Sequence, residues 1–358
     1  MDKYLESRNN STRSSLEALS WNHTGKMCVH INSGQWLSPK SRYWEYPQKN
    51  FEAQMARIER NEAAGCGNFP FLLVDYGDAI IPTMFGAGLG DIDGGPWIEH
   101  VLNDIAEVKN MSKPALDNPM WRHFLKTLDY FMEHCPEGVR IIPPHKLSPF
   151  GNAMILRGTD IYLDLYDNPA AVHELLKRVT EAFITGFEYI HDKIGTPVHD
   201  GFSPNGFPLP GIFIGDDSSI NMSNEQIWEF DLKYLEDLSK HFASPLFCHY
   251  CVMNETQGLQ LLQAYSDADF VIGLNNQYVP DFFLDNYEAY FKNRLFLATE
   301  TPIEKLGSTK ELRLSFFKDK ISRIQQEMKD KNGLLYFVGV NDEELEDFLK
   351  IQFSIRLK

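Results

Sequence analysis

Cysteine is scarce in this sequence, and its few positions are widely spaced. The 358 residues include five cysteines. An odd, scattered set of this kind does not make a disulfide framework, so we expect a protein of the reducing cytoplasm. The first residues, from Met1 to Arg8, contain no apolar stretch of the kind found in secretory signals. The five cysteines are Cys28, Cys66, Cys135, Cys248 and Cys251.

Long apolar runs and an excess of positive charge are also missing. No run of 18 apolar residues occurs, so we expect no membrane span. Lys and Arg number 34 against 50 Asp and Glu, which gives a net charge of −16. A surface of this sign does not favour nucleic acid or an anionic membrane as a partner. We expect a small-molecule substrate and a monomer or homodimer.

Nucleotide-binding patterns are absent as well. The glycine-rich segment at 85–90 does not form GxGxxG, and no GK[ST] follows it. Its glycines are therefore expected to form turns and not a phosphate cradle.

What the sequence does contain is a regular alternation of short apolar runs and longer amphipathic segments. Such an alternation predicts a parallel sheet, and about eight strand–helix units over this length predict a (β/α)8 TIM barrel. The pattern Ser223-Asn-Glu-Gln226 is a capping box that opens one of the helices. The runs of strand length lie at 28–31, 70–75, 139–143, 209–217, 245–251, 269–274, 294–299 and 334–339.

The chain shows no change in composition that would mark a linker. We therefore expect a single α/β domain over residues 1–358, in which residues 1–27 form an N-terminal arm with a short helix at about 12–20. An aromatic-rich segment follows at 36–46 and is long for a loop, which is typical of segments that cover a site.

Polar side chains stand at the ends of the predicted strands, and in a barrel the active site lies at the carboxyl ends of the strands. Two consecutive strands end in this way, one with a pair of aspartates and the next with histidine and cysteine. Adjacent residues of a strand point to opposite faces. At most one of the two aspartates therefore faces the barrel mouth, and the other can cap the turn at Ser218. The candidates for catalysis are Asp75, Asp78, Asp216 and Asp217.

His249 and Cys251 lie two residues apart on one predicted strand, so their side chains share a face. Imidazole and thiolate are ligands of Zn²⁺, and a catalytic zinc needs a third protein ligand and one open position. Asp217, or Glu300 at the end of the 294–299 run, is available as that third ligand. The sequence predicts a zinc site with His249, Cys251 and Glu300 as its metal ligands, and Asp217 as the alternative third donor.

These segments resemble the uroporphyrinogen decarboxylase superfamily from about residue 50 onward. The likeness rests on three segments in their order and spacing, although few residues are identical. They are Phe71-Leu-Leu-Val-Asp-Tyr-Gly-Asp78 with the Pro and Gly that follow, Gly215-Asp-Asp-Ser-Ser-Ile-Asn-Met-Ser223 with its capped helix, and Pro245-Leu-Phe-Cys-His-Tyr-Cys251.

The resemblance implies a (β/α)8 barrel and one of two chemistries. The decarboxylases of the superfamily use no cofactor; they hold a tetrapyrrole carboxylate with an aspartate and with arginines of a Met-Arg-Gln-Ala-Gly motif. The corrinoid- or coenzyme-M-linked methyltransferases bind zinc through His-x-Cys and a later cysteine, and the zinc activates a thiol or a methyl donor.

This sequence departs from both patterns. The region around Ile31 to Trp36 lacks the arginine motif, and no cysteine follows Cys251. Glu300 is the predicted replacement for the later cysteine. The resemblance favours a zinc-dependent methyltransferase with a corrinoid, or a corrinoid protein, as its partner. The alternatives are a tetrapyrrole-carboxylate decarboxylase that uses Asp75 or Asp78, and a non-catalytic corrinoid- or tetrapyrrole-binding protein.

Overall fold

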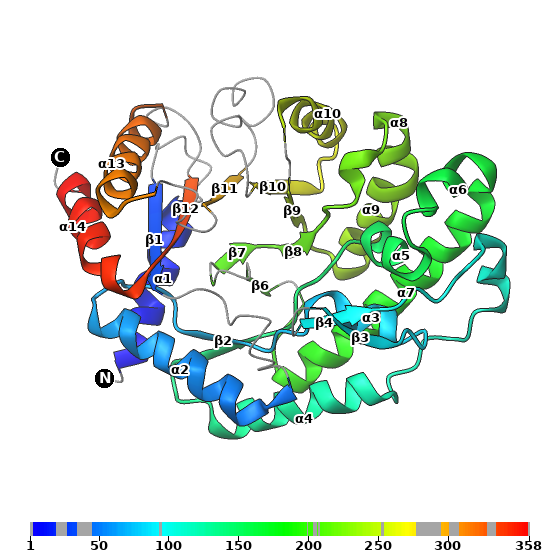
Figure 1. Ribbon diagram of the computed structural model, residues 1–358, viewed down its shortest axis with the longest axis horizontal. Coiled ribbons are helices and arrows are strands. Elements are labelled where there is room, and N and C mark those ends of the chain that lie inside the picture. Colours follow the sequence, from blue (N-terminus) through cyan, green and yellow to red (C-terminus); the bar gives the residue numbers. More distant parts are fainter. Residues whose placement is uncertain are drawn as a thin grey trace.

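The chain alternates strands and helices along most of its length, with the strands gathered in the middle and the helices around them (Figure 1). The computed structural model describes residues 3–18, 27–33, 45–92, 95–198, 200–202, 206, 208–251, 254–276, 295–300, 308–327 and 334–356. Most of the aromatic segment at 36–46 lies outside these residues.

The principal sheet has six strands, and all of its neighbouring pairs run parallel. Parallel strands covered by helices are expected to be mostly apolar, and here the polar residues gather toward the carboxyl ends of the strands, as in the sequence Val-Ile-Gly-Leu-Asn-Asn of β10. In spatial order the strands are β1 (Met27–Ser33), β12 (Leu334–Val340), β11 (Leu295–Glu300), β10 (Val271–Asn276), β9 (Leu246–Tyr250) and β8 (Ile212–Gly215).

Two further parallel strands, β2 (Phe71–Leu73) and β5 (Arg140–Ile142), form a pair of their own. The chain beyond β5 joins the principal sheet through a parallel bridge between Leu147 and Gly215. On the other side, the side-chain amide of Asn68 donates a 2.7 Å hydrogen bond to the carbonyl oxygen of Ile31 in β1. The α/β class with parallel strands is therefore as predicted, while no ladder of strand pairing joins β1 to β2 among the described residues.

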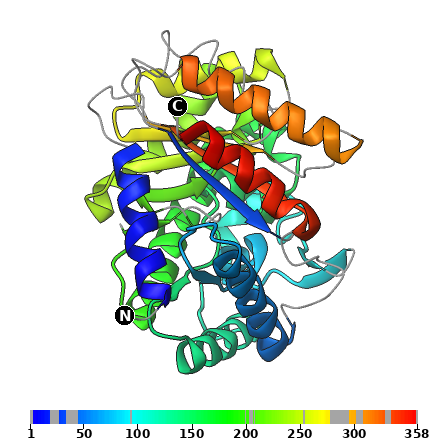
Figure 2. The same cartoon turned by 90° about the vertical axis from the view of Figure 1, so that its left-hand side faces the viewer.

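The helices cover the strands from outside, and Figure 2 shows α13 and α14 packed side by side. None of the described helices has the length and apolar character that a membrane span requires. The longer helices are α1 (Lys3–Ala18), α2 (Pro47–Ala63), α4 (Pro119–His134), α5 (Pro149–Arg157), α6 (Ile161–Asp167), α7 (Pro169–Ile194), α9 (Lys233–Phe242), α10 (Glu255–Ser266), α13 (Lys310–Glu327) and α14 (Leu345–Arg356).

Local sequence accounts for the start and the buried face of α4. The Asn118 side chain accepts a 3.0 Å hydrogen bond from the backbone N–H of Trp121, and Pro119 occupies the first turn. Both features are typical of helix N-termini. The Asn side chain satisfies an otherwise unpaired N–H, and the fixed φ of Pro suits the first turn of a helix. Trp121, Phe124 and Leu128 recur at helical spacing and are completely buried. This stripe is what attaches α4 to the core.

The predicted strand at 209–217 is wrong in extent, because the chain turns sharply at Gly211. Residues before the turn form β7 (Pro208–Pro210), which pairs antiparallel with β6 (Asp200–Phe202). Gly211 has φ +119°, and a Cβ atom there would lie 2.4 Å from the carbonyl oxygen of Pro245. Only glycine fits such a position, so β8 begins afresh at Ile212.

The N-terminal helix is longer than predicted and is packed against the body of the protein. Instead of residues 12–20, α1 spans Lys3–Ala18, and Tyr4 and Ser11 on it are buried. The hydroxyl of Ser7 donates a 2.7 Å hydrogen bond to Glu62 of α2. Contacts distant in the sequence stabilise this helix, which its polar composition does not reveal.

Candidate metal centre

The candidate centre lies where β8 and β9 end side by side. The two strands pair in parallel, with Gly215 opposite His249. Asp217 follows the end of β8 by two residues, and Cys251 follows the last residue of β9. Carboxyl ends of neighbouring parallel strands meet at one edge of a sheet, and this brings the three side chains together.

Asp217, His249 and Cys251 place three different donor atoms close to one another. The three donor atoms all lie within 4.8 Å of one another. The Cys251 Sγ atom is 3.4 Å from His249 Nε2, and Asp217 Oδ1 is 3.8 Å from the same nitrogen. A tetrahedral zinc with bonds of about 2.0–2.3 Å separates its donors by roughly 3.3–3.6 Å. The Nε2–Sγ separation lies within this range and the Nε2–Oδ1 separation slightly beyond it, so small side-chain shifts would fit the three donors around one zinc ion.

Neighbouring groups orient two of the three donors. His249 Nδ1 is hydrogen-bonded to Oδ1 of Asn275, which is buried in β10. Because the amide oxygen accepts only, the imidazole proton belongs on Nδ1, and Nε2 keeps its lone pair toward Cys251. Such a partner sets the tautomer of a metal-binding histidine. Asp217 Oδ1 in turn accepts a 2.6 Å hydrogen bond from the backbone N–H of Cys251.

The protonation of the centre follows from burial and from the Asp217 charge. Burial lowers the pKa of His249, although Asp217 opposes this shift, so the imidazole is neutral. Burial and the charge of Asp217 raise the pKa of the Cys251 thiol. The thiol therefore keeps its proton until a cation displaces it.

Asp216, predicted as a candidate for catalysis, is completely buried and points away from these donors. Its Oδ1 accepts a hydrogen bond of 2.8 Å from Ser148, and its Oδ2 accepts bonds from Ser219, at 2.7 Å, and from Tyr265. The two adjacent aspartates thus have different surroundings. Asp217 faces the donors, and Asp216 joins the start of α5 to the turn after β8.

A second buried carboxyl group lies beside Asp216. Asp231 comes from a π-helical turn at Trp228–Leu232 and is completely buried. It accepts a 3.3 Å hydrogen bond from the Tyr265 hydroxyl, which contacts both acids. Burial and the neighbouring Asp216 raise the pKa of Asp231 well above its ordinary value, which favours its protonated form.

The structure adds His145, which sequence reasoning missed, to the surroundings of the centre. His145 follows β5 in the segment Pro143-Pro144-His145, and its Nδ1 lies 3.4 Å from Asp78 Oδ1. Its ring covers Gly215, where a Cβ atom would lie 2.4 Å from the ring. The sequence contains a signal for His145, because it is a polar residue that follows the predicted strand at 139–143 by two positions.

Charges from several segments act on His145. Burial lowers its pKa, but the hydrogen bond and charge of Asp78, together with Asp75 and Asp217, raise it by more. Asp75 is exposed, but the protein atoms packed around its carboxyl group raise its pKa, while a 2.8 Å hydrogen bond from the Gly77 N–H and the His145 charge oppose this. The predicted Asp75 and Asp78 therefore stand next to the metal centre with His145 between.

Glu300, the predicted metal ligand, is the last residue of β11, but its side chain lies outside the described part of the structure. Its role stays a prediction. Among the described residues, Asp217 is the carboxylate that joins His249 and Cys251.

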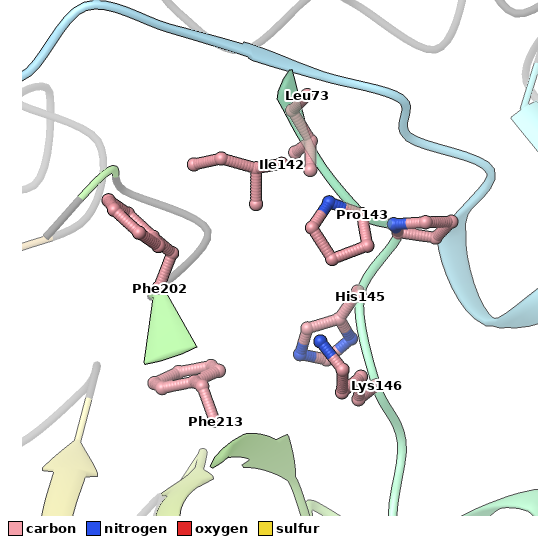
Figure 3. A pocket seen from close by; sticks show the side chains of 8 residues that line it. Leu73, Ile142, Pro143, His145, Lys146, Phe202 and Phe213 are labelled. Atoms are coloured by element: carbon pink, nitrogen blue, oxygen red, sulfur yellow. The ribbon is translucent and has the colours of Figure 1, made fainter. Parts of the chain in front are cut away.

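A pocket opens beside the centre and is shown in Figure 3. The pocket is shallow and open to solvent. Phe213 in its wall also lies near His249, with a ring-centre distance of 6.0 Å. The lining residues are Leu73, Ile142, Pro143, Pro144, His145, Lys146, Phe202 and Phe213.

Comparison with solved structures relates the fold to that of an enzyme. A methyltransferase from Methanosarcina mazei matches with a TM-score of 0.65 and 14% sequence identity, over 97% of this chain and 99% of that chain. The endo-beta1,6-glucanase BT3312 matches with a TM-score of 0.44 and 11% identity, over 90% of this chain and 73% of that one. No protein-family model and no curated protein sequence matches. The chain thus shares its fold, over nearly its full length, with a methyltransferase.

Proposed function

We propose that this protein is a zinc-dependent methyltransferase related to the corrinoid-linked branch of the uroporphyrinogen decarboxylase superfamily. One observation carries the proposal. Asp217, His249 and Cys251 converge at the ends of two neighbouring parallel strands, with the spacing of a zinc site. The fold likeness to a methyltransferase supports it, as does the His-x-Cys pattern of β9.

We further propose that the eight parallel strands form a (β/α)8 barrel. The order from β8 through β9, β10, β11 and β12 to β1 is continuous. The bridge at Gly215 and the hydrogen bond from Asn68 to Ile31 supply the two remaining junctions with β5 and β2. In a barrel of this kind the carboxyl ends of all eight strands face one mouth, and the centre would lie at that mouth.

His249 Nε2, Cys251 Sγ and Asp217 Oδ1 would hold the zinc, with Asp217 in place of the later cysteine of the methyltransferase branch. Bound there, zinc would act as a Lewis acid that lowers the pKa of a substrate thiol or polarises a methyl–oxygen bond. Asn275 holds the imidazole in the tautomer that presents Nε2. Asp75, Asp78 and His145 place titratable groups beside the metal centre, and His145 also lines the pocket.

Metal analysis tests the proposal directly. Protein purified without chelator is expected to carry close to one zinc per chain, and His249→Ala and Cys251→Ser are each expected to lose it. Cys135→Ser is a matched control, since Cys135 lies at the end of α4, and it should keep its zinc. A zinc content of less than a few tenths per chain that added metal does not raise would rule the proposal out.

Partner and substrate assays separate the alternatives. Methyl transfer to or from a corrinoid, free or protein-bound, is expected of the methyltransferase. Release of CO₂ from uroporphyrinogen would instead indicate the tetrapyrrole-carboxylate decarboxylase. A corrinoid titration that changes the absorbance, with no turnover of any methyl donor, would indicate the non-catalytic binding protein.

A further inference from the structure

Lys146 is a buried lysine in the wall of the pocket beside the metal centre. Only 9% of its surface is exposed. The pocket presents apolar groups from four elements, including Leu73, Ile142 and Phe213. Figure 3 draws Lys146 and His145 on one side of the pocket, with Phe202 and Phe213 on the other.

The Lys146 amine has unusual surroundings for a lysine. It lies 5.1 Å from the centre of the Phe187 ring. Within the described part of the chain, no carboxylate or hydrogen-bond acceptor contacts its Nζ atom. By contrast, Lys193 pairs with Asp129 at 2.7 Å and Lys240 with Glu236 at 2.8 Å. Burying an ammonium group without a partner is costly, and the group loses its proton instead.

Charge and burial therefore favour the neutral amine. Burial lowers the pKa of Lys146 to about 7, and the neighbouring Arg140 acts in the same direction. An exposed lysine has a pKa near 10.4 and is almost entirely protonated at neutral pH. A desolvated lysine in an apolar pocket is the usual form of a nucleophilic amine.

We propose that Lys146 is a nucleophile that forms an imine with small aldehydes or ketones of apolar character in this pocket. The lone pair of Nζ attacks the carbonyl carbon, and a C–N bond forms. The carbonyl C–O bond then breaks, and its oxygen leaves as water with the two protons that the amine gives up. The product is a C=N bond, and no oxidant, reductant or metal takes part. The site is therefore independent of the zinc chemistry proposed above.

Reductive trapping identifies such an amine. The intact protein is incubated with propanal and sodium cyanoborohydride at pH 7, and the modified lysines are located by peptide mass spectrometry. We expect Lys146 to be modified about tenfold faster than exposed lysines, because a far larger share of it is neutral. Lys240 and Lys350, whose side chains are 66% and 71% exposed, are internal references.

Lys146→Arg and Lys146→Met are the matched variants. Both remove the amine, and both should abolish labelling of this segment while the reference lysines react as before. Labelling that follows exposure, with Lys240 and Lys350 ahead of Lys146, would overturn the proposal even if neither variant folds. Zinc content is measured on the same samples. If the wild-type protein holds no zinc but Lys146 is still labelled, the result would count against the methyltransferase proposal alone.

Discussion

Asp217 Oδ1 accepts a 2.6 Å hydrogen bond from the backbone N–H of Cys251. This bond joins the ends of two neighbouring strands and aims a carboxylate at the His-x-Cys pair. The Asp217 carboxylate thereby becomes available as a third metal donor, since no cysteine follows Cys251 in the sequence.

Asp217→Asn is expected to weaken zinc binding by about 100-fold, since a neutral amide is a far poorer zinc ligand than a carboxylate. Asn keeps an oxygen that can accept the Cys251 N–H bond, so the fold should persist. Titration against a chromogenic zinc chelator measures the change. Asp117→Asn, at a carboxylate that is 86% exposed, is the control. Unchanged zinc affinity in Asp217→Asn would assign the third ligand to another residue.

Asn275→Ala is expected to lower zinc affinity by about 10–100-fold, the range for partners that orient a metal-binding histidine. The variant removes the acceptor of His249 Nδ1 and lets the other tautomer form. Asn275→Asp restores an acceptor and should recover most of the affinity. Equal affinities in the two variants would show that this contact does not orient the ligand.

Zinc affinity is expected to rise with pH across the neutral range. Burial and Asp217 raise the pKa of the Cys251 thiol, so the metal must displace its proton. His249 does not oppose this, since burial lowers its pKa and it is already neutral. Affinity should change by about tenfold per pH unit for one released proton. Calorimetry in buffers of different ionisation enthalpy counts that proton, and an affinity independent of pH would contradict the assignment.

Asp231→Asn is expected to make stability less sensitive to pH. Burial and Asp216 raise the pKa of Asp231 in the folded protein. The unfolded chain releases this proton near pH 4, while the folded chain keeps it to higher pH. The contribution of Asp231 to the free energy of unfolding therefore falls as the pH rises above about 4. An amide does not titrate, and the variant should match or exceed the wild type at pH 8.

Urea unfolding at pH 5 and pH 8 measures this difference. The companion variant Asp216→Asn is expected to lose about 1–3 kcal/mol, because three hydroxyl groups donate to that carboxylate. A gain in stability for Asp216→Asn and a loss for Asp231→Asn at pH 8 would contradict the assignment of the raised pKa to Asp231.

The alternation of apolar and amphipathic segments was enough to predict most elements. The capping box at Ser223 and Gln226 forms as expected, with a 3.0 Å bond from the Ser223 N–H to the Gln226 side chain. The break at Gly211 escaped prediction because it depends on the approach of Pro245, which lies more than thirty residues away.

Strand periodicity alone determined that His249 and Cys251 share a face and that Asp216 and Asp217 do not. Tertiary structure decided which aspartate meets the His-x-Cys pair. It also brought in Asn275 and His145, which come from other strand ends. The physical reason is that spacing within one strand is fixed by backbone geometry, whereas distances between strands depend on register and packing. The His-x-Cys pattern was readable in the sequence, and its third donor became visible only in the folded chain.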